Sequence, residues 1–200
     1  RHIDKVNPKF NALVSLRDYE VLLEEALECD KELSKGIYRG WMHGLPHAVK
    51  DLADVEGLLT TKGSPVLKDN VAVKDSIFVE RIRQAGAIII GKTNVPEYGL
   101  GSHTYNPIFG ATLNAYDGKS TAGGSSGGAA AGLALKMLPL ADGSDFMGSL
   151  RNPAAFNNVI GFRPTPGRVP LDNMFIETLS CNGPMARNVS DTAMLLSTMA

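Results

Sequence analysis

The sequence predicts an α/β fold in which helices cover both faces of a β-sheet. Two observations lead to this prediction: short apolar runs typical of buried strands, and amphipathic stretches with helical periodicity that alternate with them. A third is the composition of the 200 residues, of which 44% are apolar and 20% charged, as in ordinary globular proteins. Aromatic residues make up only 6%, so the core must consist mainly of aliphatic side chains. No repeat and no linker divides the chain, and we expect one domain over residues 1–200.

The first quarter of the chain predicts a long helix between two strands. Asn11–Leu16 is a candidate short strand, and Tyr19–Leu33 places its leucines on one helical face before Gly36 ends the helix. Acidic side chains occupy the other face, which is typical of a solvated surface. The run Ala48-Val49 then predicts a strand that ends in the charged pair Lys50-Asp51.

A capped helix and a buried strand follow in the middle of the chain. Asp75 or Ser76 can cap a helix that runs to Ala85, and Gly86 lies just past its end. Ala87–Ile90 is an apolar run with three β-branched members, which predicts a buried strand.

The second half continues the alternation around two loops. Gly123–Gly128 is a glycine-rich loop, and Asp142–Ser149 is a tight loop. The remaining predicted elements are a helix over Ala129–Lys136, a strand over Met137–Ala141, a helix over Leu150–Asn158 with Pro153 in its first turn, a strand over Val159–Arg163 and a final helix capped by Ser190.

The composition excludes several classes of function. Twenty basic and twenty-one acidic side chains give a net charge of −1 without a basic run, so direct binding to nucleic acid is not expected. No apolar stretch approaches the roughly 18–20 residues that span a bilayer, and no secretory leader opens the chain. The two cysteines, Cys29 and Cys181, form no CxxC pair. They argue against a disulfide framework or a zinc site, and they favour a cytoplasmic protein without metal or cofactor.

One motif indicates a nucleotide site but lacks the required context. Gly86–Thr93 matches the phosphate-binding pattern GxxxxGK[ST] letter for letter. That pattern needs a strand before its first glycine and a helix that starts at its lysine, so that free amides surround phosphate. Here a helix precedes Gly86 and a strand occupies the variable positions. We therefore interpret the segment as a helix end followed by a strand.

A second motif, GxSxG at Gly123–Gly127, is typical of the α/β-hydrolase nucleophile. Those enzymes carry their histidine after the serine in the chain. All four histidines of this sequence precede Ser125, and the run before Gly123 is turn-like rather than a strand. This interpretation requires a histidine from a C-terminal part that the sequence does not contain.

Three features remain: Lys50 at a strand end, the doubled serine Ser125-Ser126 in the glycine loop, and Ser149 in the second loop. The Gly-Gly-Ser-Ser-Gly-Gly run is also compatible with a flexible linker. It leads directly into an alanine-rich helix, however, so we expect an ordered loop at a helix N-terminus, where free amides favour negative charge. Helix capping is the alternative role for both serines of the pair.

Together with these residues, seven blocks of the chain resemble the amidase signature hydrolases. Each block alone is weakly specific, but they occur in the family's order and extend over nearly the whole sequence. The blocks are Gly44–Asp51, Gly91–Asn94, Glu97–Gly99, Thr121–Gly128, Gly143–Ala154, Gly161–Arg168 and Gly183–Arg187.

The resemblance implies hydrolysis of a carboxamide C–N bond, in a small molecule, through an acyl-serine intermediate. It assigns Lys50 as the base, Ser125 as a bridging serine that follows a cis peptide bond, and Ser149 as the nucleophile. It also implies a large mixed sheet between helices. Full-length members are more than twice as long, so the chain would be an N-terminal fragment, truncated at its C-terminus.

By the same resemblance, the backbone amides of Phe146, Met147, Gly148 and Ser149 would form the oxyanion hole. The family usually has two glycines before the nucleophile, and Met147 stands at the first of them. Its amide remains, but a left-handed backbone there would cost about 1–3 kcal/mol. We expect a reshaped acyl pocket rather than a loss of catalysis.

Two supporting residues are also implied. Ser126 is expected to hold the backbone around the cis bond by hydrogen bonding. Arg151 is expected to brace the nucleophile loop, and an ordinary surface arginine is the alternative.

The proposed base must lose its charge, because free lysine has a pKa of about 10.4. Burying Lys50 without a carboxylate partner would lower the pKa of its amine towards about 7–8, which suits a general base. Asp51 would oppose this if it touched Lys50, but adjacent residues of a strand point to opposite faces. Ser125 can then relay a proton, since a hydroxyl both donates and accepts.

Two other functions stay open. An amidotransferase A-type subunit, which passes ammonia from glutamine to a charged tRNA, shares the triad. It typically has Gly-Gly before the nucleophile and Gln after the arginine, where this chain has Met147 and Asn152. A non-catalytic fragment is the other: a sheet cut in half exposes an unpaired edge and apolar faces, which leaves a homo-oligomer open.

Overall fold

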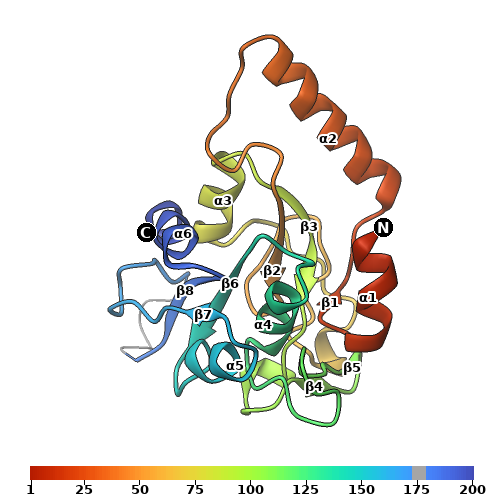
Figure 1. The fold of residues 1–200 in the computed structure, drawn as a ribbon, viewed down its shortest axis with the longest axis vertical. Helices are drawn as coiled ribbons and strands as arrows, with labels where there is room; N and C mark the ends of the chain where they lie inside the picture. Colours follow the sequence, from red (N-terminus) through yellow and green to blue (C-terminus); the bar gives the residue numbers. More distant parts are fainter. Residues whose placement is uncertain (173–178) are drawn as a thin grey trace.

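A computed structural model describes residues 1–172 and 179–200 as a layered α/β molecule (Figure 1). Two short 3₁₀ turns lie at Pro65–Leu67 and Glu97–Gly99. The helices and strands, in chain order, are α1 (His2–Phe10), β1 (Leu13–Val14), α2 (Tyr19–Ser34), β2 (Pro46–Lys50), α3 (Ile77–Gln84), β3 (Ile88–Thr93), β4 (Tyr105–Asn106), β5 (Gly110–Ala111), α4 (Gly127–Ala134), β6 (Leu140–Asp145), α5 (Arg151–Phe156), β7 (Ile160–Gly161), β8 (Cys181–Ala186) and α6 (Val189–Met199).

The strands form two three-stranded sheets and a small hairpin of β4 and β5. In the first sheet β3 lies between β2, to which it is parallel, and β1, to which it is antiparallel. In the second sheet β8 lies between β6 and β7 and is antiparallel to both. β2 and β6 meet in the centre of the molecule, where the Asp142 carboxylate accepts the backbone N–H of Lys50 at 3.2 and 3.3 Å (Figure 1).

Helices cover both faces of the strands, and strand residues alternate between two cores. Ile88 and Ile90 pack into a core that contains Leu133 of α4 and Ala154 of α5. Ile89, between them, packs into the opposite core with side chains of α3 and α6, which lie together in Figure 1. This alternation is expected of strands that are buried on both faces. The predicted fold class, a mixed sheet between helices, is therefore confirmed.

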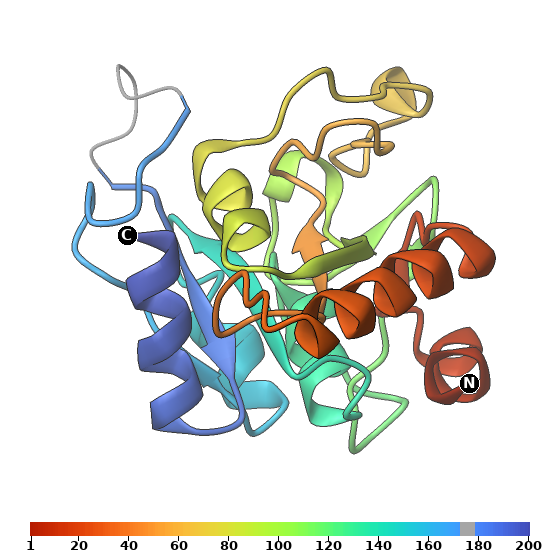
Figure 2. The ribbon, with the colours of Figure 1, turned by 90° about the horizontal axis from the view of Figure 1, so that it is seen from above.

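The predicted helix after the first strand is present as α2, but its apolar face is only partly covered. Leu22 and Ala26 pack against the core, and Cys29 is buried. Leu23, Leu27 and Leu33, which the periodicity placed on the same face, are 40–49% exposed. Both views show α2 on the outside of the molecule (Figures 1 and 2).

Two predicted boundaries differ where strands continue past their apolar runs. The strand expected over Ala87–Ile90 continues to Thr93, and the one expected over Met137–Ala141 runs from Leu140 to Asp145. Both extensions are polar but buried, because they lie in the middle of the molecule. The second loop therefore begins only after Asp145.

Two predicted helix caps are wrong. Ser190 lies inside α6, and the helix is capped by Asn188, whose side chain accepts the N–H of Asp191 at 2.8 Å. α3 has no cap from its own N-terminal side chains; instead the Asp172 carboxylate accepts the N–H of Ile77 at 3.1 Å.

The other predicted helices and strands are present with shifted ends, whereas α1, the β4–β5 hairpin and β8 were not predicted. Within the described ranges, none of the helices has the length and apolar character needed to cross a membrane.

Candidate active site

Lys50 is the last residue of β2, and its side chain is almost completely buried, at 1% exposure. Its amine nitrogen lies 2.8 Å from Oγ of Ser125, 2.7 Å from Oγ of Ser126 and 2.9 Å from Oγ of Ser144. A neutral amine has two N–H donors and one lone pair, so three hydroxyls can satisfy it fully. No ion pair found among the described residues includes Lys50.

Burial lowers the pKa of Lys50 from its ordinary value of 10.5 to about 7. The carboxylates of Asp142 and Asp145 oppose this change, because their negative charge favours the ammonium form. Near neutral pH the amine and the ammonium are thus both well populated. A group with such a pKa is suited to accept and return a proton at neutral pH.

Asp51 points away from Lys50 and pairs with a different lysine. Nζ of Lys92 lies 3.4 Å from Oδ1 of Asp51, and Thr61 donates to the same carboxylate through its N–H and, at 2.6 Å, its hydroxyl. Lys92 also donates to the carbonyl of Ala53 at 2.6 Å. The lysine of the GxxxxGK[ST] pattern is therefore buried within β3, and it holds the chain that follows β2.

The glycine loop before α4 is ordered by close backbone packing. The peptide bond between Gly124 and Ser125 is cis. Gly123 has a φ of +75°, and a Cβ there would lie 2.7 Å from Cα of Pro153, so only glycine fits this position. Thr104 donates its hydroxyl to the carbonyl of Gly123 at 2.8 Å. The alternative of a flexible linker does not agree with these contacts.

Ser126 occupies the N-cap position of α4, but its side chain makes no capping bond. Its hydroxyl contacts Lys50, as described above, and accepts the N–H of Ser144 at 3.3 Å. Ser126 thus joins the glycine loop to β6, in addition to touching the amine.

Asp145 connects the end of β6 to the loop that carries Ser149. Its buried carboxylate accepts two hydrogen bonds from Arg151, both at 3.0 Å, and one from Arg163 at 2.8 Å. The backbone N–H groups of Gly148 and Leu150 also donate to it, at 2.8 and 3.1 Å. These donors hold the pKa of Asp145 far below its usual range, although burial acts in the opposite direction. Arg151 thus contacts the loop in the bracing geometry that the resemblance implied.

The contact between Asp145 and Gly148 changes the predicted oxyanion hole. Because the N–H of Gly148 is bonded to a carboxylate, this amide is removed from the expected set of donors. Among the described residues, the N–H groups of Phe146, Met147 and Ser149 have no hydrogen-bond acceptor. Met147 is not among the residues with positive φ, so the strain considered for a side chain at this position is absent. Its side chain is instead 83% exposed.

Ser149 lines the same cavity as Lys50 and Ser125, a hollow of about 840 Å³. Its hydroxyl makes no hydrogen bond to a described residue, whereas its carbonyl accepts the N–H of Ser126 at 3.3 Å. The structure therefore brings Lys50, Ser125 and Ser126 into direct contact and places Ser149 at the wall beside them. Apolar side chains around this cavity are Leu52, Tyr98, Leu100, Phe146, Met147 and Leu171.

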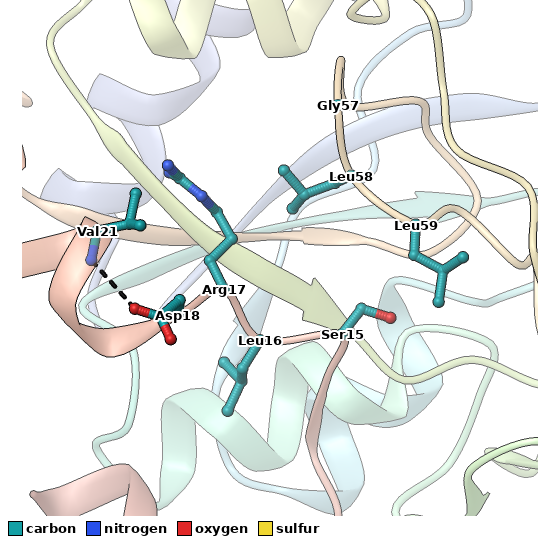
Figure 3. A pocket seen from close by; sticks show the side chains of 8 residues that line it. All are labelled: Ser15, Leu16, Arg17, Asp18, Val21, Gly57, Leu58 and Leu59. Atoms are coloured by element: carbon teal, nitrogen blue, oxygen red, sulfur yellow. Dashed lines mark hydrogen bonds between the residues drawn. The ribbon is translucent and has the colours of Figure 1, made fainter.

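A smaller cavity of about 390 Å³ lies beside the start of α2, between Ser15–Val21 and Gly57–Leu59 (Figure 3). Arg17 donates to Glu25 and to the carbonyl of Ile89. The Asp18 carboxylate caps α2 by accepting the N–H of Val21, the bond drawn in Figure 3. The charged groups of this cavity are thus engaged within the protein.

Cys29, Glu32 and His43 bring three potential metal ligands within 4.8 Å of one another. The Nδ1 atom of His43 accepts the N–H of Arg39, which places the ring proton on Nε2, and Nε2 lies 3.0 Å from the carbonyl of Cys29. Arg39 also pairs with the Glu32 carboxylate. This geometry does not present a free lone pair of His43 to a metal ion.

Sequence reasoning missed Ser144, Arg163 and the buried pair of His47 and Asp142. The strand period could have found one of them: Asp142 and Ser144 are two apart on β6 and therefore share a face, which is the face directed at β2. Arg163 and His47 carry no comparable local signal, because their partners are 18 and 95 positions away.

Comparison with known proteins gives one consistent result. The family model described as Amidase matches residues 1–200. An acylamidase of Rhodococcus erythropolis is 41% identical over all of this chain and 42% of its own length, and an A-type glutamyl-tRNA(Gln) amidotransferase subunit from Coxiella burnetii is 40% identical over 99% of this chain and 41% of its own length. The crystal structure of a bacterial aryl acylamidase superposes with a TM-score of 0.92 at 34% identity, over 98% of this chain and 42% of that one. The chain thus spans less than half the length of the relatives that it matches.

Proposed function

Because the chain belongs to the amidase signature family, we propose that it hydrolyses a carboxamide C–N bond through an acyl-serine intermediate, with Lys50, Ser125 and Ser149 as the catalytic residues. One observation carries this proposal: a buried lysine with a pKa of about 7 contacts the Ser125 hydroxyl on a cavity that Ser149 also lines. A base, a proton relay and a nucleophile are thereby present around one space.

In the first half of the reaction, the neutral amine of Lys50 accepts the proton of Ser125 while Ser125 accepts the proton of Ser149. The Ser149 oxygen attacks the acyl carbon, and the negative charge that develops on the carbonyl oxygen is stabilised by backbone N–H groups. Phe146, Met147 and Ser149 have the amides available for this task. The proton then returns through Ser125 to the nitrogen, and the C–N bond breaks to release the amine and leave an acyl-serine.

In the second half, a water molecule takes the place of the amine. Lys50 and Ser125 accept its proton as its oxygen attacks the acyl carbon, and Ser149 leaves with a proton returned along the same route. The carboxylic acid is released and the starting protonation state is restored. Three hydroxyls around Nζ allow the amine to be satisfied in both of its charge states.

The cavity favours a substrate with an apolar group next to its amide. Phe146 and Met147 flank the nucleophile and are 51% and 83% exposed, so both can contact an acyl chain or an aryl ring. The amidotransferase function remains the second candidate, because a relative of that kind is 40% identical over nearly the whole chain. Ammonia transfer that requires glutamyl-tRNA and partner subunits would favour the second candidate.

A serine-reactive fluorophosphonate tests the proposed nucleophile in the full-length protein. We expect one phosphonylated residue, Ser149, in the peptide map, and no labelling of the Ser149→Ala variant. Labelling at another serine, or labelling that persists in that variant, would contradict the assignment.

A further inference from the structure

His47 and Asp142 form a buried pair directly behind the main chain of Lys50, and the proposed reaction does not yet use them. Their side chains are 0% and 1% exposed, and Nε2 of His47 lies 3.0 Å from Oδ1 of Asp142. His47 belongs to β2 and Asp142 to β6, so the pair joins the two sheets at the strand that ends in Lys50.

The Asp142 carboxylate holds two residues of β2 at once. Besides His47, both of its oxygens accept the backbone N–H of Lys50, at 3.2 and 3.3 Å. Asp142 itself is fixed in register by the ladder between β6 and β8, where it lies opposite Pro184. A single side chain therefore determines how β2, and with it the amine of Lys50, sits against β6.

The hydrogen bonds also define the charge of the pair. Nδ1 of His47 is buried and has no partner among the residues that the structure describes. A proton on Nδ1 would be an unsatisfied buried donor, so the ring fits best as a neutral imidazole that donates its Nε2 proton to Asp142. Asp142 then keeps a full negative charge that its histidine orients but does not cancel.

That charge acts on Lys50 differently from the other carboxylate near it. Asp145 is paired with Arg151 and Arg163, whereas Asp142 has only hydrogen bonds from His47 and a main-chain N–H. Asp142 favours the ammonium form of Lys50 and, more distantly, that of Lys92 on β3, which has its own counter-ion in Asp51. The remaining groups around Nζ are the three serine hydroxyls.

We propose that His47 and Asp142 are positioning residues for Lys50: the imidazole orients the carboxylate, and the carboxylate fixes the lysine main chain and sets the basicity of its amine by its charge. This inference rests on the proposed function of Lys50 as the base. A merely structural tie between the sheets would hold the strands together without affecting when the amine takes up a proton.

The pH dependence of kcat/KM for a chromogenic amide, measured on the full-length protein, separates the two roles. Asp142→Asn keeps an oxygen that can accept both bonds at the position of Oδ1 but removes the charge. Loss of a nearby negative charge disfavours the ammonium, so the acidic limb of the profile should move to lower pH by about half a unit or more. The plateau should fall about tenfold, because a weaker base removes a proton less effectively.

His47 supplies a matched pair of variants. His47→Gln keeps an N–H donor and should retain kcat within about threefold and the acidic limb of the unmodified protein. His47→Leu removes the donor and should lower kcat about tenfold. An unchanged limb in Asp142→Asn, or equal activity of the two His47 variants, would overturn the inference.

Two checks keep the result interpretable. Cooperative thermal unfolding establishes that each variant is folded, and if Asp142→Asn does not fold, the comparison of the two His47 variants decides. Fluorophosphonate labelling of Ser149 in the unmodified protein establishes the proposed function independently. If labelling and turnover are present but the limb does not move, only the role of Asp142 fails; if Ser149 is neither labelled nor required, the proposed function fails as well.

Discussion

Ser149→Ala in the full-length protein should lower kcat for a simple aryl or aliphatic amide by at least about 10⁴-fold. Without the hydroxyl there is no oxygen to form the acyl intermediate, and the base and the relay have no proton to remove from it. KM should change little if the cavity wall is otherwise intact, since the side chain loses only one oxygen. Turnover measured by release of the amine, at saturating substrate, checks this result.

Ser102→Ala is the matched control for this change. Ser102 lines the same cavity, but its hydroxyl makes no bond to Lys50. We expect this variant to stay within about tenfold of the unmodified protein. Comparable turnover of Ser149→Ala and the unmodified protein would remove Ser149 from the mechanism.

The second large effect is expected at Lys50. Lys50→Met keeps an unbranched side chain in the buried site but supplies no lone pair, and kcat should fall about 10³-fold through loss of the base. Lys50→Arg should be comparably inactive, because a guanidinium does not lose its proton in this pH range. If the lysine acted only as a positive charge, the arginine variant would retain substantial activity.

The main contacts of the site followed from short-range features of the sequence. A lysine at a strand end, a glycine-serine loop at a helix start and the period of a strand are local, and they correctly predicted that Lys50 is buried and that Asp51 points away from it. The direct contact between Lys50 and Ser126 was not expected, because it depends on how β6 places Ser144 beside both of them.

The features that were missed depend on tertiary packing. β8 contains Gly183 and Pro184, which predict against a strand, yet it lies between β6 and β7. A Cβ at Gly183 would lie 2.4 Å from the carbonyl oxygen of Phe162, so the glycine permits the close approach of the chain beside it. The loss of Gly148 from the oxyanion donors likewise depends on the loop folding back onto Asp145. Such contacts cannot be read from local patterns.

The central claim is that the amine of Lys50 is uncharged when it begins the reaction. The rate of fluorophosphonate labelling of Ser149, measured from about pH 5.5 to 9 on the full-length protein, tests it most directly, because labelling requires deprotonation of the nucleophile but no leaving amine. We predict that the rate rises with pH through a single ionisation near pH 7, in agreement with the pKa of about 7 for Lys50. A rate that does not change over this range, or that rises only towards about pH 10 as for an ordinary lysine, would contradict the account.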